Sequence, residues 1–217
     1  MLKIRISKDA ETRKTEILNA AEELFSEKGY DGASISDIID KVGVARGTVY
    51  YHFKSKEDVL DALIERMGNR FLTAAREIAA DKSIPVLERW FKTLMSLSAG
   101  SSTDKKLNEH MHKPQNARMH QKTHKVMLKG IPPILTEIVE DGIKENLFNT
   151  PYPCEIMEMI VAYVIMVFDD DFMSDLPPEK QMNKIVSFIF NVERLLGAES
   201  GAFAPIMELF NEGGDKG

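Results

Sequence analysis

The sequence predicts an all-α protein, and three observations predict it. Apolar residues recur at intervals of three and four along most of the 217-residue chain, which is the spacing of an amphipathic helix. Ser or Pro precedes several of these segments, and Gly follows several of them, as is typical of helix ends. No segment shows the strict alternation of apolar and polar residues that indicates a strand.

The N-terminal part begins with a long predicted helix. Its apolar stripe ends at Gly29, a residue that tolerates the positive φ of a helix C-terminus. The motif Ser34-Ile-Ser-Asp37 has the form of an N-cap with an acidic helper, and it predicts a short helix that Gly43 ends. The stripe of the long helix consists of Ile17, Ala20, Ala21, Leu24 and Phe25.

Two further helices are expected in the first 70 residues. A second short helix should run from about Ala45 to Phe53, with Val49 and Phe53 facing the core. Ser55-Lys-Glu-Asp58 repeats the capping pattern and predicts the start of another long helix. This part of the chain is therefore predicted to hold two short helices, joined by a tight turn, between two long ones.

The remaining segments are also predicted to be helical, with wider apolar faces. Pro85 suits the first turn of a helix. Asn116 to about Gly142 is periodic, but Pro132-Pro133 should kink or break that helix. Helices from Cys154 to about Met173 and from Pro178 to about Leu196 complete the prediction.

Positive charge is concentrated in two short segments of an acidic chain. The formal net charge is −6, but Met1–Lys14 holds five basic and two acidic side chains. Lys41–Lys56 holds four basic side chains and no acidic one. Charge of one sign on one segment indicates a partner more strongly than the total does.

The composition excludes several classes of protein. The single cysteine, Cys154, excludes an intrachain disulfide framework and agrees with a reducing compartment. The most apolar run, Ile156–Phe168, contains Glu158 and is shorter than the roughly 20 residues of a membrane span. The N-terminus lacks the apolar core of a signal peptide. We therefore expect a cytoplasmic protein that does not enter a membrane.

Motifs of catalysis are not found in the sequence. There is no Gly-x-Ser-x-Gly, no phosphate-binding loop and no paired-glycine dinucleotide motif. Cys154 follows Pro153 at a predicted helix start, but no histidine lies near it in the sequence. We expect neither enzymatic activity nor a cofactor.

The pair of short helices has the features of a DNA-reading motif. Two short helices joined by a turn with Gly suit a helix-turn-helix, whose second helix places its N-terminal residues in the major groove. Arg46 could reach a guanine or a phosphate, and Gly47 would let the backbone approach DNA closely. Further polar groups follow along the segment: Thr48, Tyr50, Tyr51, His52, Lys54 and Lys56.

The stretch Ile17–Leu60, which ends in GTVYYHFKSKEDVL, resembles the N-terminal domain of the TetR/AcrR family of one-component transcriptional repressors. The resemblance covers residues 11–71 and implies a DNA-binding domain there, with the helix-turn-helix at 34–53 and a basic arm at 1–10. Ala45 stands where Ser is frequent in the family, so a cap hydroxyl is missing. The implied DNA-binding residues are Ser34, Arg46, Gly47, Thr48, Tyr50, Tyr51, His52 and Lys56.

By the same resemblance, residues 72–217 form a larger helical domain for effector binding and dimerisation. A homodimer would bind a palindromic operator, and a small apolar or amphipathic ligand would release it. The last two long helices are the candidates for the dimer interface, through Ile156, Ile160, Val164, Val167, Ile185 and Ile189. An effector pocket could be lined by Trp90, Phe91, Met95, Met111, Met119, Met127, Phe148, Tyr163 and Met166.

Two alternatives remain open at this level. One is a metal-responsive regulator, because His110, His112, His120 and His124 lie within 15 positions and imidazoles bind Zn or Ni. Basic residues crowd the same stretch, however, and disfavour another cation. The other alternative is a DNA-binding protein without a ligand, although the acidic body of the chain argues against it.

Overall fold

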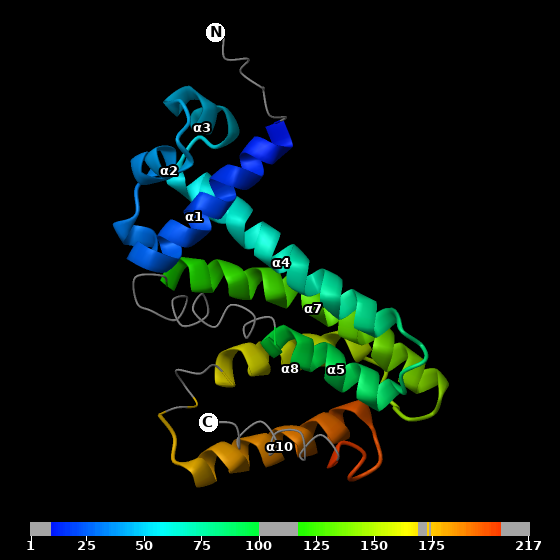
Figure 1. The fold of residues 1–217 in the computed structure, drawn as a ribbon. Coiled ribbons are helices and arrows are strands. Elements are labelled where there is room, and N and C mark those ends of the chain that lie inside the picture. Colours follow the sequence, from blue (N-terminus) through cyan, green and yellow to red (C-terminus); the bar gives the residue numbers. More distant parts are fainter. Residues whose placement is uncertain (1–9, 100–116, 169–172, 174, 205–217) are drawn as a thin grey trace. The chain divides into compact units, whose positions relative to one another are not determined.

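The computed structural model describes residues 10–99, 117–168, 173 and 175–204 (Figure 1), without the side chains of residues 95 and 97–99. Within these ranges all regular secondary structure is helical, and the all-α prediction is confirmed. None of the described helices is both long enough and apolar enough to cross a membrane.

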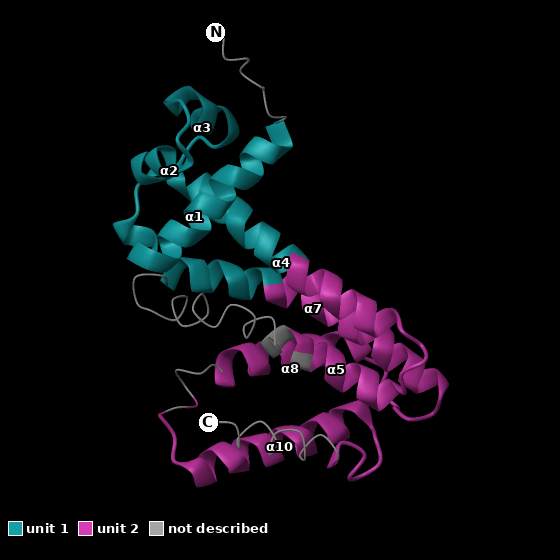
Figure 2. Cartoon of the chain, viewed as in Figure 1, with its two compact units in different colours: residues 1–69, 101–126 teal, residues 70–100, 127–217 magenta. Residues whose placement is uncertain are grey.

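The chain divides into two compact units (Figure 2). The first unit holds residues 1–69 and 101–126, and the second holds residues 70–100 and 127–217. Two helices, α4 (Lys56–Ala80) and α7 (Ala117–Lys144), contribute residues to both units. The start of α7, up to Val126, therefore belongs with the N-terminal helices, although it lies far from them in the sequence.

The first unit is built from α1 (Ala10–Gly32), α2 (Ile35–Val42), α3 (Arg46–His52) and the N-terminal ends of α4 and α7. The apolar stripe expected on α1 is buried, and it shares the core with the matching stripe of α4. The buried α4 residues are Val59, Leu60, Leu63, Ile64 and Met67. Gly29, with φ 75° and ψ 161°, interrupts α1 where the sequence predicts its end, and a last turn continues to Gly32.

The second unit contains the rest of α4 and α7 together with α5 (Val86–Ala99), α8 (Pro153–Val167) and α10 (Pro178–Leu196). Trp90 of α5 is buried; its ring packs edge-on against Phe203 at 5.2 Å and its Nε1 lies 3.4 Å from Met157 Sδ. Helices α8 and α10 contact each other, and the Tyr163 ring stacks on Phe188 at 5.5 Å. Aromatic side chains from α5, α8, α10 and the segment after α10 therefore contribute to the core of this unit.

The sequence predicts that Pro132-Pro133 kinks or breaks a helix, and the predicted break is wrong. Pro132-Pro133 does not break α7, which runs without interruption from Ala117 to Lys144. The helix survives because both flanks of the proline pair are anchored in the core through Ile131, Ile134 and Leu135. Burial of this apolar stripe offsets the lost backbone hydrogen bonds.

The predicted C-terminal end is correct for α10 but not for α8. Helix α10 has the predicted bounds, Pro178–Leu196, and ends at Gly197 with φ 62°. Helix α8 ends at Val167, earlier than the Met173 expected from the sequence. Residues 169–172 lie outside the described part of the chain.

Candidate nucleic-acid interface

The first helix of the motif, α2, is fixed by a complete capping box. The Ser34 hydroxyl accepts from the Asp37 backbone N–H at 3.1 Å, and the Asp37 carboxylate accepts from the Ser34 backbone N–H at 2.7 Å. Hydrogen bonds from Lys28 and Ser34 hold the pKa of Asp37 well below its usual range. Ser34, a predicted DNA-binding residue, therefore uses its hydroxyl to begin α2.

The turn between α2 and α3 requires a glycine. Gly43 has φ 69° and ψ 36°, in the left-handed region, and its N–H donates to the Ile39 carbonyl at 3.0 Å. Helix α3 then starts after Ala45, which makes no side-chain cap, as the sequence indicates. A backbone hydrogen bond of 2.8 Å from Thr48 N–H to the Ala45 carbonyl closes the first turn.

Helix α3 has a buried side and an exposed side. Val49 is fully buried and Phe53, just after the helix, is buried too, as the sequence predicts. They hold α3 on the first unit. The exposed side carries Arg46, Gly47, Tyr50 and Tyr51, while Thr48 and His52 are half-buried at its margins.

The exposed side chains of α3 offer donors that suit nucleic acid. The Arg46 guanidinium carbon lies 5.3 Å from the centre of the Tyr50 ring, and Arg46 Nη2 lies 3.4 Å from the Tyr50 hydroxyl. Tyr51 has 79% of its surface exposed and packs edge-on against His52. A Cβ added at Gly47 would meet nothing within 4 Å, so this point of the backbone is open to a partner.

Lys56 is placed differently from the other predicted DNA contacts. Its ammonium donates to the backbone carbonyls of Tyr30 and Ala33 at 2.8 and 2.9 Å and lies 4.3 Å from the centre of the Tyr30 ring. These carbonyls belong to the end of α1 and the segment after it, so Lys56 ties the start of α4 to the end of α1. Its direct contact with DNA stays a prediction, whereas Lys54 nearby is exposed.

A charged network behind the motif was missed by the sequence reasoning. Glu57 accepts from the Tyr30 hydroxyl at 2.7 Å and pairs with Lys122 of α7 at 2.5 Å. Lys122 also pairs with Asp61. Burial, followed by the hydrogen bond to Glu57, raises the pKa of Tyr30 to about 12. The network joins α1, α4 and α7 within the first unit. The residues next to Lys122 in the sequence give no indication that it pairs with Glu57 and Asp61.

The predicted pocket residues fall into different environments. Trp90, Phe91, Met119 and Phe148 are buried, Met127 and Tyr163 are half-buried, and 62% of Met166 is exposed. Met111 and the side chain of Met95 lie outside the described part of the chain. A cavity described in the second unit lies instead among residues 82–89 and 141–145.

The predicted interface residues lie mostly on the inner sides of their helices. Ile156, Ile160 and Ile189 are buried within the protomer, and Val164, Val167 and Ile185 are half-buried. The apolar residues that α8 and α10 leave exposed are their neighbours: Met159, Met166, Met182, Val186, Phe190 and Leu195.

The histidine cluster receives no support as a metal site. His120 and His124 lie on α7 with ring centres 4.0 Å apart, and His110 and His112 lie outside the described residues. Within the described part of the chain, no group of three or more His, Cys, Asp or Glu side chains could hold a metal ion.

The geometry defines a class of protein: a short helix with exposed Arg and Tyr side chains, set on a capped partner helix, is a helix-turn-helix DNA-binding unit. Comparison with known proteins agrees. Residues 17–63 match the model of bacterial regulatory proteins of the tetR family, and residues 99–189 match the tetracyclin repressor-like C-terminal domain. The chain belongs to the TetR family and is a transcriptional regulator, not an enzyme.

Two curated relatives cover much of the chain. The fatty acid metabolism regulator protein of Bacillus subtilis is 31% identical over 137 residues, which are 60% of this chain and 68% of the relative. The regulator UidR of Escherichia coli K12 is 30% identical over 147 residues, which are 65% of this chain and 74% of the relative.

Solved structures share the fold. The fatty acid degradation regulator FadR of Bacillus halodurans superposes with a TM-score of 0.61 at 25% identity, over 88% of this chain and 96% of that one. A TetR/AcrR-family regulator of Thermobifida fusca gives a TM-score of 0.53 at 24% identity, over 85% and 96% of the two chains.

Proposed function

We propose that this protein is a cytoplasmic repressor that binds a palindromic operator as a homodimer and is released by a small amphipathic ligand. The observation that carries the proposal is the exposed side of α3. It presents Arg46, Gly47, Tyr50 and Tyr51, while the buried Val49 anchors the opposite side of the helix. No acidic side chain interrupts the segment Lys41–Lys56, so phosphates would meet only cations and neutral donors there.

Within this proposal, Arg46 contacts a base edge or phosphate, and Tyr50 and Tyr51 donate to the DNA backbone. Gly47 allows the close approach of the α3 backbone. Ser34 and Lys56 act by holding α2 and α4 in place, because both side chains are engaged within the unit. This division separates residues that touch DNA from residues that position the helix.

The homodimer is supported by the apolar surface of the last two helices. Exposed residues of α10 recur every four positions, at Met182, Val186 and Phe190, and α8 adds Met159 and Met166. A continuous apolar stripe on a helix is normally covered. We propose that a second copy of the chain covers it, which would place two α3 helices on the same face of DNA.

The proposed amphipathic ligand is supported by the similar proteins, since Trp90 and Phe91 themselves are packed in the core of the second unit. Two proteins similar to this chain are named as regulators of fatty acid metabolism or degradation, which favours a ligand with an apolar chain. The ligand acts only through different affinities for the DNA-binding and released states.

Selection from random duplexes tests the proposal. We expect enrichment of an inverted repeat whose half-site centres are about one helical turn apart, because a two-fold dimer presents two α3 helices. Enrichment of a single half-site would contradict the dimer, and no enrichment would contradict sequence-specific binding.

The selected duplex then tests Arg46. Arg46→Ala should weaken binding by about 1–3 kcal/mol per protomer, the cost of one lost base contact. Arg76→Ala removes an exposed arginine of α4 in the second unit and is the matched control. Equal affinities of the two variants in a gel-shift titration would refute the assignment.

A further inference from the structure

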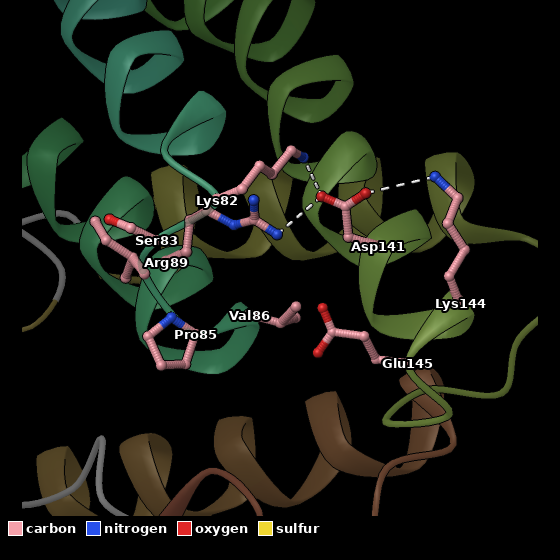
Figure 3. A pocket seen from close by; sticks show the side chains of 9 residues that line it. Lys82, Ser83, Pro85, Val86, Arg89, Asp141, Lys144 and Glu145 are labelled. Atoms are coloured by element: carbon pink, nitrogen blue, oxygen red, sulfur yellow. Dashed lines mark hydrogen bonds and ion pairs between the residues drawn. The ribbon is translucent and has the colours of Figure 1, made fainter.

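A cavity of about 390 Å³ lies in the second unit, where the turn after α4 meets the C-terminal end of α7 (Figure 3). Its lining is strongly charged: it includes the cations Lys82, Arg89 and Lys144 and the carboxylates Asp141 and Glu145. None of these five residues belongs to the DNA-binding motif. The cavity therefore needs an explanation of its own.

Three cations converge on one carboxylate at this cavity, as Figure 3 shows. Asp141 Oδ2 accepts from Lys82 and from Arg89 Nη2, the latter at 2.8 Å, and Asp141 Oδ1 lies 3.4 Å from Lys144. The lining holds three positive and two negative side chains, and the carboxylate of Asp81, which accepts from the Ser83 backbone N–H at 3.0 Å beside the cavity, brings the local charge into balance. An anion would therefore be held where the lysines turn from Asp141 toward it, and not by a net positive charge of the cavity.

Arg89 is the most informative member of the group. Only 2% of its surface is exposed, and its Nη1 reaches the Ala79 carbonyl at a long 3.4 Å. Its Nε is buried without a hydrogen-bond partner among the described residues. A buried guanidinium N–H without a protein acceptor is costly, so an oxygen of a bound anion that reached Arg89 Nε would be stabilised there.

The two lysines can serve a ligand because their side chains are largely exposed. Their side chains are 61% (Lys82) and 73% (Lys144) exposed, so either ammonium can rotate from Asp141 to an incoming anion. Arg89 would keep Asp141 paired in the meantime, because it is buried and fixed. The cavity thus has one rigid cation and two adaptable ones.

The rest of the lining indicates that the anion has an apolar part and is larger than an inorganic ion. Ile84, Pro85 and Val86 form an apolar wall where α5 begins, and the first backbone N–H groups of that helix favour negative charge. A volume of about 390 Å³ falls in the range of small-molecule sites and exceeds the size of an inorganic ion.

We propose that this cavity binds a small organic anion, a carboxylate or a phosphate monoester, through Lys82, Lys144 and the buried Arg89, with its apolar part on the wall of Ile84, Pro85 and Val86. The inference does not depend on the proposed operator binding, since every residue in it belongs to the second unit.

Amide chemical shifts of the full chain, with inorganic phosphate and butyrate as separate probes, test the proposal. Ionic strength is held constant with chloride. We expect saturable shifts at Ser83, Val86 and Arg89 with at least one probe, and the stronger of the two identifies a phosphate or a carboxylate site. Shifts that stay linear with both probes, or that avoid these amides, would overturn the proposal.

Three conservative variants should change the affinity for the probe in opposite directions. Lys82→Gln and Lys144→Gln should each weaken binding roughly two- to fivefold, as expected for partly exposed ion pairs. Glu145→Gln removes a repelling carboxylate and should strengthen binding by a similar factor. All three sites are exposed, so folding should be kept. Equal affinity in the three variants would refute the site even if the probe bound.

Discussion

Lys56 offers the sharpest test of how the DNA-binding unit works, because two roles for it make opposite predictions. If its ammonium contacts a phosphate, Lys56→Met changes the salt dependence of operator binding. If it holds the end of α1, as the hydrogen bonds to Tyr30 and Ala33 indicate, the same variant lowers the stability of the fold. Because the ammonium has these internal partners, we expect the second outcome.

The size of the effect follows from the contacts. Two hydrogen bonds of 2.8 and 2.9 Å from a charged donor, together with the contact to the Tyr30 ring, are lost in Lys56→Met. Hydrogen bonds to charged groups contribute about 1.5–3 kcal/mol when buried, and Lys56 is half-buried. After a discount for solvent screening we expect a loss of about 1–2 kcal/mol in the free energy of unfolding.

Lys54→Met is the matched control, since Lys54 is exposed and only two residues away. Urea denaturation should place Lys54→Met within about 0.5 kcal/mol of the parent protein and Lys56→Met below it. The slope of log affinity against log salt should become shallower by about 0.9 per lost phosphate contact for Lys54→Met only. A stable Lys56→Met with a shallower slope would refute the positioning role.

Two further predictions concern single residues. Gly47→Ala should raise the stability of the fold by about 0.5–1 kcal/mol, because alanine favours a helix and the new Cβ meets nothing within 4 Å. The same variant should weaken operator binding, because its methyl group would keep the α3 backbone from approaching DNA closely. Unchanged affinity in a gel shift would contradict that close approach. Asp141→Asn should cost about 2–4 kcal/mol in urea denaturation at neutral pH, because it leaves the buried Arg89 without a carboxylate. Since hydrogen bonding to Lys82 lowers the pKa of Asp141 from its usual 3.8, this contribution is complete above that value and is lost as the pH falls below it. The difference between parent and variant should therefore shrink only in acid, and a difference that is equal at all pH values would exclude the ion pair as its source.

Local features of the helix-turn-helix could be predicted because their causes are local. The capping box of Ser34 and Asp37, the turn at Gly43 and the missing cap at Ala45 depend on residues within a few positions of each other. The burial of Val49 and Phe53 follows from the apolar spacing of a short amphipathic segment. The exposed side of α3 is then the remaining side, and it carries Arg46, Gly47, Tyr50 and Tyr51, whereas Ser34 and Lys56 lie elsewhere.

The amino-acid sequence by itself thus determined the helices, their caps and the family, since these depend on near neighbours and on a specific local motif. The tertiary structure alone decided which polar side chains are engaged: Lys56 with the end of α1, Lys122 with Glu57, and Arg89 with Asp141. It also decided that α7 continues through Pro132-Pro133. The ion pairs and hydrogen bonds join groups up to 65 positions apart, such as Glu57 and Lys122, which meet only in the folded chain. The continuity of α7 depends on the free energy of burying its apolar residues, which is also gained only on folding.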